Sequence, residues 1–228
     1  PIYLFFISGL RCNQDYSMFL TTSCGLVFGF CTKMIINWLS IEGYKIKTGN
    51  IFPEITSLAL CYWAFSTLSI SEAMIFALIV NVLIGISLID YNTMQIPLVF
   101  ILIGLVTILA SNFVKIVSLS SILWGIFVGA CIPLIIVGTL WLITKRQGMG
   151  FGDIQMGIIL GAWLGPFRMA ITLFFASLMS LIVWVCVSLL HGFDKDRAIP
   201  LAPFLSVAGV GTFVGSLYYP NIFHLLII

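Results

Sequence analysis

Two aspartates at the edges of apolar segments are the residues of this chain best suited to chemistry. Asp153 directly follows three alternating glycines, Gly148, Gly150 and Gly152, and Asp90 ends a second apolar run. Two carboxylates that share one proton can hydrolyse a peptide bond, because one acts as a base toward water while the other donates a proton to the carbonyl. At about 4 Å two like charges repel by about 4 kcal/mol at an effective dielectric near 20, which keeps that proton in place. Such a pair requires no metal and no cofactor.

The glycines before Asp153 have two interpretations. Without Cβ atoms they can adopt positive φ and let another chain approach closely, so the loop could lie beside an extended substrate. Alternatively, Asp153 caps the helix that follows and the glycines form an ordinary loop. Asp90 likewise has a structural interpretation, as a solvated loop residue where a helix leaves the bilayer. Both pairs of interpretations stay open at this point.

Other polar or special residues give weaker signals. Glu54 follows Pro53 at the opening of an apolar segment, where the helix dipole alone favours an acid. Pro97 suits the first turn of the next helix. His191 and His224 are solitary, with no partner at the spacing that metal ligands require, so no metal site is expected.

The composition indicates a membrane protein. Of 228 residues, 61% are hydrophobic and 8% are charged, which is too apolar for a soluble core of this size. The formal net charge is only +2 and the basic residues do not cluster, so a nucleic-acid partner is not expected. The six cysteines lie mostly in apolar runs without a Cys-x-x-Cys pair, and we interpret them as small hydrophobic residues.

The apolar runs are long enough to cross a bilayer. A hydrocarbon core about 30 Å thick needs roughly 20 helical residues. On that measure the chain has eight segments, at about 17–40, 51–70, 72–89, 96–114, 117–143, 154–166, 168–190 and 200–217. Lys33 interrupts the first segment and must reach the membrane surface or face protein. We therefore predict an all-α, polytopic integral membrane protein with about eight transmembrane helices.

The sixth segment is unusually short. As a helix, residues 154–166 would be about 20 Å long, less than the hydrocarbon thickness. Either the bilayer thins there or the start of this helix, with Asp153, lies in a water-filled cavity. We favour the cavity, because a carboxylate in lipid costs about 2.5–3.5 kcal/mol.

Basic residues in loops predict the orientation, because cytoplasmic loops are enriched in lysine and arginine. The bias is six residues to three: Lys45, Lys47, Lys145, Arg146, Lys195 and Arg197 against Arg11, Lys115 and Arg168. It places both termini outside and the Asp90 and Asp153 loops together on the cytoplasmic side, with the loop that carries Asp194 and Asp196.

The motifs around the two aspartates resemble the signatures of the type IV prepilin peptidases, a family of GxGD membrane aspartic proteases. That family's second signature is typically Gly-Met-Gly-Gly-Gly-Asp followed by Gly-Ala-Trp-Leu-Gly, and residues 148–153 and 161–165 are similar. Its first signature, Ile-Asp followed by Ile-Pro, is similar to residues 89–90 and 96–97. Here Phe151 replaces a glycine and Gln155 stands where a lysine is common, which would alter substrate fit and leave both aspartates in place.

Further blocks extend the resemblance over most of the chain. Residues 199–205, which include Pro200 and Pro203, look like the family's Ile-Pro-Phe-Gly-Pro-Phe-Leu segment. Pro53-Glu54 resembles its Pro-x-x-Glu element in compressed form, and residues 25–29 are similar to its N-terminal Gly-Leu-x-x-Gly.

The resemblance implies a prepilin leader peptidase of the bacterial inner membrane, multi-pass, with its active site facing the cytoplasm. Asp90 and Asp153 would be catalytic, and the implied substrates are type IV prepilins or type II secretion pseudopilins, whose apolar helix lies in membrane lipid. Glu54, Gly148, Gly150, Gly152, Pro97, Pro200 and Pro203 would bind substrate or shape the loops. Residues 1–50 would form an N-terminal helix and a shortened cytoplasmic loop, and residues 51–228 the membrane-embedded peptidase domain.

The chain departs from the family pattern between its first two helices, and this bears on the cofactor that we expect. Family members that also methylate the new N-terminus usually carry a cytoplasmic region between the first two helices, often with paired Cys-x-x-Cys motifs. Only residues 42–50 fill that gap here, which argues against methylation. S-adenosylmethionine would be needed only if methylase activity is retained.

Two rival functions fit some of these features. A small proton- or cation-coupled transporter could use the same aspartates as ligands. A presenilin-like intramembrane protease shares the GxGD element, but Asp90 lacks a preceding tyrosine and Pro200-Leu201-Ala202-Pro203 differs from that family's Pro-Ala-Leu.

Overall fold

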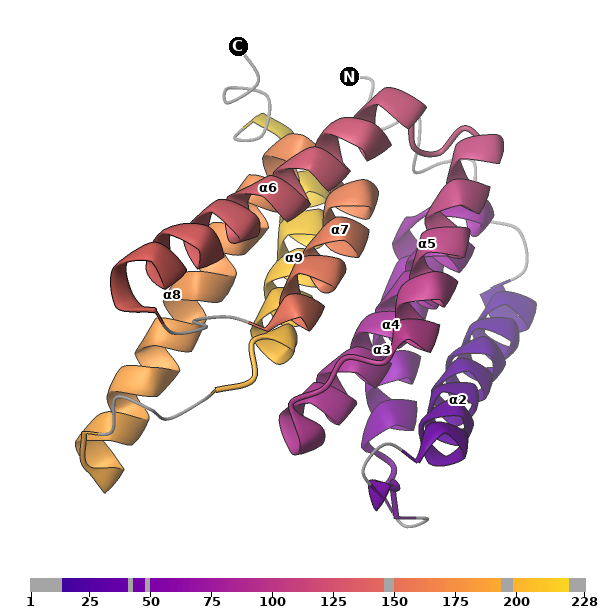
Figure 1. Ribbon diagram of the computed structural model, residues 1–228. Coiled ribbons are helices and arrows are strands. Elements are labelled where there is room, and N and C mark those ends of the chain that lie inside the picture. The colour runs from indigo at the N-terminus through magenta and orange to yellow at the C-terminus, as the bar shows by residue number, and fades with distance from the viewer. Residues whose placement is uncertain (1–13, 41–42, 48–49, 146–149, 194–198, 222–228) are drawn as a thin grey trace.

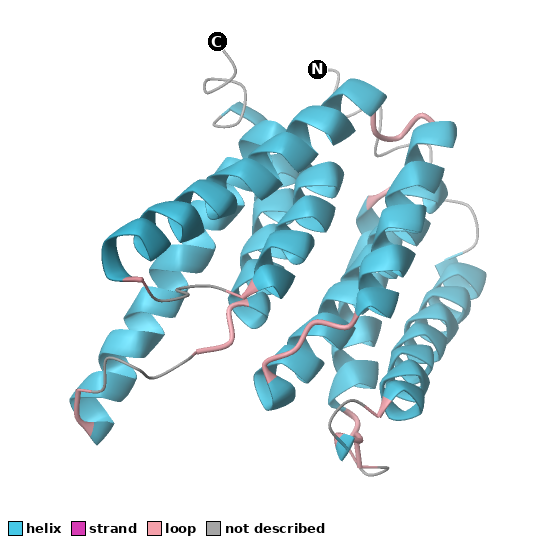
Figure 2. Ribbon diagram, viewed as in Figure 1, coloured by secondary structure: helices cyan, strands magenta, loops and turns pink. Residues whose placement is uncertain are grey.

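The computed structural model describes residues 14–40, 43–47, 50–145, 150–193 and 199–221, and within these ranges the regular structure is helical, with no β-strand (Figure 2). The helices are α2 (Gln14–Leu39), α3 (Phe52–Thr67), α4 (Ile70–Thr93), α5 (Leu98–Phe113), α6 (Leu119–Thr144), α7 (Phe151–Leu164), α8 (Pro166–His191) and α9 (Ala202–Tyr218). Each predicted apolar segment corresponds to one of them, with ends shifted by a few residues. The apolar stretch at 222–228 lies outside the described residues.

The helices confirm an all-α, polytopic membrane protein. Four of them, α2, α4, α6 and α8, are long and apolar enough to cross a membrane, and α5, α7 and α9 are shorter apolar helices. The prediction of eight separate spans stays a prediction. The division at residue 50 also stays a prediction, and α2 packs on α3 and α4 across it.

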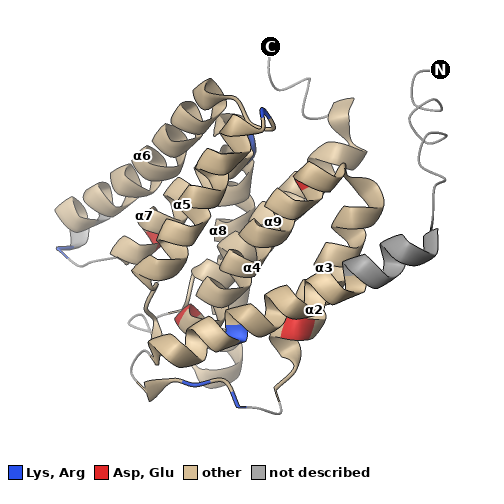
Figure 3. Cartoon of the chain, turned by 90° about the vertical axis from the view of Figure 1, so that its right-hand side faces the viewer, with Lys and Arg blue, Asp and Glu red and all other residues tan. Residues whose placement is uncertain are grey.

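Consecutive helices alternate in direction, so that the connections gather at two ends of the molecule (Figure 1). The end of α4 and the starts of α7 and α9 lie at one end, together with Lys45, Lys47 and Lys145. The connection between α5 and α6, with Lys115, and the start of α8, with Arg168, lie at the opposite end. Figure 3 colours the basic residues blue and the acidic residues red.

An aromatic cluster joins three helices at that opposite end. The rings of Phe76 on α4 and Trp163 on α7 are 5.9 Å apart, and both stand close to Phe213 on α9, at 5.2 and 4.9 Å. Phe76 is almost fully buried, and such aromatic pairs contribute about 0.5–1.5 kcal/mol each beyond the area they bury. The cluster fixes one end of the three helices whose other ends carry the candidate site.

Glycine pairs four residues apart bring two helix pairs into backbone contact. A Cβ on Gly125 or Gly129 of α6 would collide with the carbonyl oxygen of Gly161 or Gly157 of α7. Close crossings of this kind need small residues on both helices. The second pair, Gly25 and Gly29, packs α2 on α3.

Candidate active site

Asp90 lies in the last turn of α4, not in a loop as predicted. Its side chain is only 5% exposed. The helix continues past it because Met94 closes α4 in the left-handed region, with φ 55°, and donates its N–H to the Asp90 carbonyl oxygen at 2.9 Å. The structural interpretation of Asp90 as a solvated residue is therefore wrong, and a buried carboxylate requires a polar partner.

The first turn of α9 supplies that partner. The Ala202 N–H donates to Asp90 Oδ2 at 3.1 Å. Ala202 is the first residue of α9, where backbone N–H groups have no partner within the helix, and Pro203 behind it carries no N–H. Within residues 200–203, singled out for their prolines, the amide of Ala202 thus bonds Asp90. Pro200 and Pro203 are themselves partly buried.

Asp153 lies in the first turn of α7, held by the glycine loop. Gly150 is the N-cap residue, and its N–H donates to Asp153 Oδ2 at 3.2 Å. The prediction that Asp153 itself caps the helix is wrong by three positions, because its carboxylate reaches back to the cap as in a capping box.

The three glycines before Asp153 differ in whether the structure requires a glycine at that position. A Cβ on Gly152 would lie 2.9 Å from the Cβ of Ile96, so this position must be glycine for the connection after α4 to approach α7. Gly150 has φ −73°, which any residue adopts, so positive φ is not needed there. Gly148 lies outside the described residues.

The approach at Gly152 brings the segment that follows Asp90 against the turn that carries Asp153. Ile96 and the buried Pro97 belong to the connection between α4 and α5, and Pro97 stands directly before α5 as its N-cap, not inside the first turn as predicted. Contacts from α4, α7 and α9 therefore converge at this end of the bundle.

The two carboxyl groups interact electrostatically. Asp153 lies outside the four long apolar helices, in the first turn of a helix 14 residues long. Its burial, together with the negative charge of Asp90, raises the pKa of Asp153 from 3.8 to about 6, against a lowering effect of the Gly150 amide. A like charge disfavours ionisation of its neighbour, as in pairs of carboxylates that share a proton.

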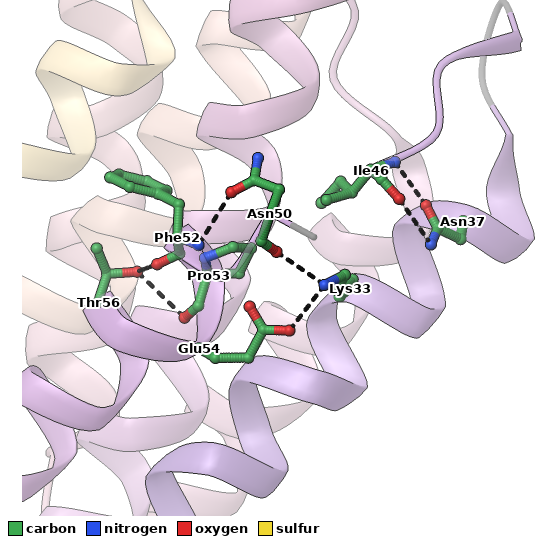
Figure 4. A network of polar contacts seen from close by, with 8 residues as sticks. All are labelled: Lys33, Asn37, Ile46, Asn50, Phe52, Pro53, Glu54 and Thr56. Carbon is green, nitrogen blue, oxygen red and sulfur yellow. Dashed lines mark hydrogen bonds and ion pairs between the residues drawn. The ribbon is translucent and has the colours of Figure 1, made fainter. Parts of the chain in front are cut away.

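Glu54 does not join this pair by any contact that the structure shows. It forms an ion pair with Lys33 of α2, with Nζ 3.0 Å from Oε1, and Lys33 also donates to the carbonyl oxygen of Asn50 at 2.7 Å (Figure 4). Lys33 was predicted either to reach the membrane surface or to face protein. It is only 8% exposed, so it faces protein. The second oxygen of Glu54, Oε2, is buried and has no hydrogen-bond partner among the described residues.

Glycine spacing explains how the ion pair forms. A Cβ on Gly29 would lie 2.6 Å from the Cα of Glu54, and one on Gly25 would lie 2.7 Å from the Cα of Leu58. Lys33 is one turn beyond Gly29 on the same face of α2. This pairing was not predicted, although the spacing of Gly25, Gly29 and Lys33 in the sequence is its signal.

The sequence of this chain is similar to that of a known protein family. Residues 77–185, which contain both aspartates, match the model of the type IV leader peptidase family. The chain is 30% identical over 186 residues to the prepilin leader peptidase/N-methyltransferase of Aeromonas hydrophila, covering 77% of this chain and 63% of the relative. The protein of the same name from Pseudomonas aeruginosa is 29% identical over 188 residues, with the same coverage.

A third relative carries the same name. The protein from Dichelobacter nodosus is 29% identical over 194 residues, covering 79% of this chain and 64% of the relative. The chain thus spans less than two thirds of the length of these curated relatives. No solved structure is a match. The sequence matches confirm the resemblance that the motifs around Asp90 and Asp153 indicated.

Proposed function

We propose, from the premise that this chain is a relative of the type IV leader peptidases, that it is a membrane aspartic endopeptidase. Its reaction is hydrolysis of the peptide bond that follows the basic leader of a type IV prepilin or pseudopilin. The observation that carries the proposal is that Asp90, buried at the end of α4, and Asp153, in the first turn of α7, lie at the same end of the bundle, where Ile96 packs against Gly152. The charge of Asp90 contributes to raising the pKa of Asp153 to about 6. Such a pair retains one proton under conditions where isolated aspartates retain none.

Each aspartate accepts one backbone N–H, and the raised pKa of Asp153 suggests which of the two carries the shared proton. Asp90 accepts the Ala202 N–H through Oδ2, and we assign it the role of the carboxylate base toward water. Asp153 accepts the Gly150 N–H through Oδ2 and holds the shared proton. The base takes a proton from water, the water oxygen attacks the carbonyl carbon, and Asp153 protonates the carbonyl oxygen.

The second half of the reaction restores the pair. The tetrahedral intermediate collapses, the C–N bond breaks, and the leaving amine takes the proton that Asp90 had accepted from water. The hydroxyl that had received the Asp153 proton returns it as the new carboxyl group forms. One water molecule is consumed, no electron is transferred, and both aspartates regain their starting protonation.

The proposed location is the bacterial inner membrane, with the aspartates facing the cytoplasm. The connections at the end of the molecule that carries the pair contain Lys45, Lys47 and Lys145, while Lys115 and Arg168 lie at the other end, which is the bias expected of cytoplasmic and outer loops. Cysteines placed at Lys145 and Lys115 test this: in intact cells a membrane-impermeant thiol reagent should label the second and spare the first. The reverse pattern would contradict the orientation.

We limit the proposal to the peptidase reaction. The relatives' names include an N-methyltransferase, so S-adenosylmethionine belongs to their described activity. In this chain the connection between α2 and α3 is short, and Ile46 within it exchanges two hydrogen bonds with the Asn37 side chain, at 2.7 and 3.3 Å. The peptidase family match gives no support to the transporter alternative.

Purified chain incubated with a synthetic prepilin tests the proposal. Wild-type protein should release the leader, and Asp90→Asn and Asp153→Asn should each lose cleavage while keeping the wild-type melting temperature within a few degrees. Glu72→Gln is the matched control, because Glu72 is the first-turn acid at the far end of α4 and glutamine preserves its capping box. Cleavage that survives either asparagine variant would overturn the proposed pair.

A further inference from the structure

Helices α4 and α9 are antiparallel neighbours, and Asp90 lies at one end of the contact between them (Figure 1). At that end the Ala202 N–H bonds the Asp90 carboxylate. At the far end the aromatic cluster joins the same two helices. Between these contacts, Ser87 of α4 and Ser206 of α9 form a hydrogen bond, with their hydroxyl oxygens 2.6 Å apart. We call these two residues the serine pair.

The hydroxyl groups of the serine pair satisfy each other. Ser206 donates to the carbonyl oxygen of Leu83 on α4 at 3.4 Å. With that proton placed, Ser87 is the donor and Ser206 the acceptor of the shorter bond, so both hydroxyl protons have a partner. Ser206 is only 8% exposed and Ser87 is partly buried. Because a buried hydroxyl that loses its partner costs free energy, the serine pair favours one placement of α9 on α4.

The serine pair lies one helical turn from the bond between Asp90 and Ala202. Ser87 is about 4.5 Å from Asp90 along the axis of α4, and Ser206 is about 6 Å from Ala202 along the axis of α9. Residues three or four apart share a helix face, so the two hydrogen bonds join the same two faces. Where Ser206 lies against α4 therefore determines where the Ala202 amide lies relative to Asp90.

A different register of the two helices would break the bond of the serine pair. If α9 moved by one turn along α4, Ala202 or Val210 would lie opposite Ser87, and neither side chain can form a hydrogen bond. Lipid is as apolar as the helices, so packing and interhelical hydrogen bonds determine how membrane helices meet. The serine pair is such a bond, placed next to the aspartate whose position matters for chemistry.

We propose that Ser87 and Ser206 are positioning residues for the peptidase reaction, whose hydrogen bond holds α9 where its first amide reaches Asp90. The inference rests on the proposed peptidase function. The serines act through Ala202, whose N–H orients the Asp90 carboxylate. A displacement of about 1 Å in an active site can cost about 10²-fold in rate. A smaller displacement of Asp90 should therefore slow the chemical step and leave substrate binding unchanged.

Ser206→Ala and Ser87→Ala test the inference, because each removes one hydroxyl group and leaves both aspartates in place. Ser216→Ala is the matched control. Ser216 lies on the same helix and is 7% exposed, but its hydroxyl donates within α9, to the Phe213 carbonyl oxygen at 2.7 Å. In both test variants kcat for synthetic prepilin in proteoliposomes should fall about tenfold with KM unchanged. Ser216→Ala should keep both constants.

Two further variants separate positioning from packing. Because one hydrogen bond joins the two hydroxyl groups, the double variant Ser87→Ala/Ser206→Ala should be no slower than either single variant. Ser87→Thr keeps a hydroxyl group at a partly buried position and should keep the wild-type kcat. Losses that multiply in the double variant, or a loss in Ser87→Thr equal to that in Ser87→Ala, would contradict the inference.

Hydrogen exchange of the Ala202 amide gives a readout that does not depend on cleavage. As the first residue of α9, Ala202 has no partner for its N–H within the helix, so slow exchange of this amide reports its bond to Asp90. Exchange in detergent should be faster in Ser206→Ala and Ser87→Ala than in wild-type chain or in Ser216→Ala.

Wild-type kcat in both serine variants would overturn the inference, as would an equal loss in Ser216→Ala or slower cleavage without faster exchange at Ala202. Melting temperatures that fall in step with kcat would also overturn it, because the bond would then only stabilise the bundle. Wild-type chain that cleaves no prepilin would refute the proposed function, whereas unchanged exchange at Ala202 in a chain that cleaves prepilin would refute only the role of the serine pair.

Discussion

Replacing Asp90 by asparagine should lower the pKa of Asp153 without returning it to its ordinary value. The elevation from 3.8 to about 6 corresponds to about 3 kcal/mol between the two protonation states. Burial is the largest cause and remains in the variant, whereas the charge of Asp90 is the second cause and disappears. The pKa of Asp153 in Asp90→Asn should therefore lie between the two values.

A hydrophobic carbodiimide measures this shift, because it modifies protonated carboxyl groups in apolar surroundings. The modified fraction of Asp153, followed by mass spectrometry across pH, should have its midpoint near pH 6 in wild-type chain and at lower pH in Asp90→Asn. Glu72→Gln removes a remote carboxylate and should leave the midpoint unchanged. A wild-type midpoint near pH 4, or identical midpoints with and without Asp90, would refute the electrostatic coupling.

The raised pKa of Asp153 predicts how stability and cleavage rate depend on pH. The folded chain favours the neutral form of Asp153, so this contribution to stability is complete below pH 3.8 and is lost as pH rises through about 6. Cleavage should fall over the upper part of the same range, because the pair then loses the proton that it must donate.

Two further substitutions test the packing that holds the site. Gly129→Leu should destabilise the chain by about 3 kcal/mol or more, because its side chain would enter the backbone of α7 at Gly157, and the melting temperature should drop while Gly138→Leu melts like wild type. Lys33→Met should cost about 3–5 kcal/mol by leaving Glu54 buried without its partner, measured by denaturant unfolding in detergent. Wild-type stability in Lys33→Met would mean that Glu54 is free to serve another role, such as binding the basic leader.

The helices could be predicted from the sequence because an apolar segment long enough to cross a bilayer is recognised from its own residues, whatever it packs against. The burial of Asp90 in the last turn of α4 could not be predicted in this way. Its burial depends on α4 continuing to Thr93 and on an amide at the start of α9, more than a hundred residues later. An apolar segment ends at a charged residue in the sequence whether that residue contacts water or a distant helix, so the pattern does not distinguish the two cases.

The glycine spacings show a similar limit. Residues 25–29 and 211–215 have the same pattern in the sequence, but the first pair is covered by α3 and the second faces open space. Spacing predicts that a helix can be approached closely, and only the arrangement of helices decides whether one is there. At Gly152 the close approach is that of Ile96 of the same chain, whereas the approach predicted from the glycines was that of an extended substrate, which stays a prediction.

The central claim is that Asp90 and Asp153 act as one unit, and a double-mutant comparison of prepilin cleavage tests it most directly. If they share one proton and one water molecule, Asp90→Asn, Asp153→Asn and the double variant should each fall by about 10⁴-fold to the same residual rate. A single variant that retains near-wild-type cleavage, or a double variant whose loss is the product of two independent losses, would contradict the account.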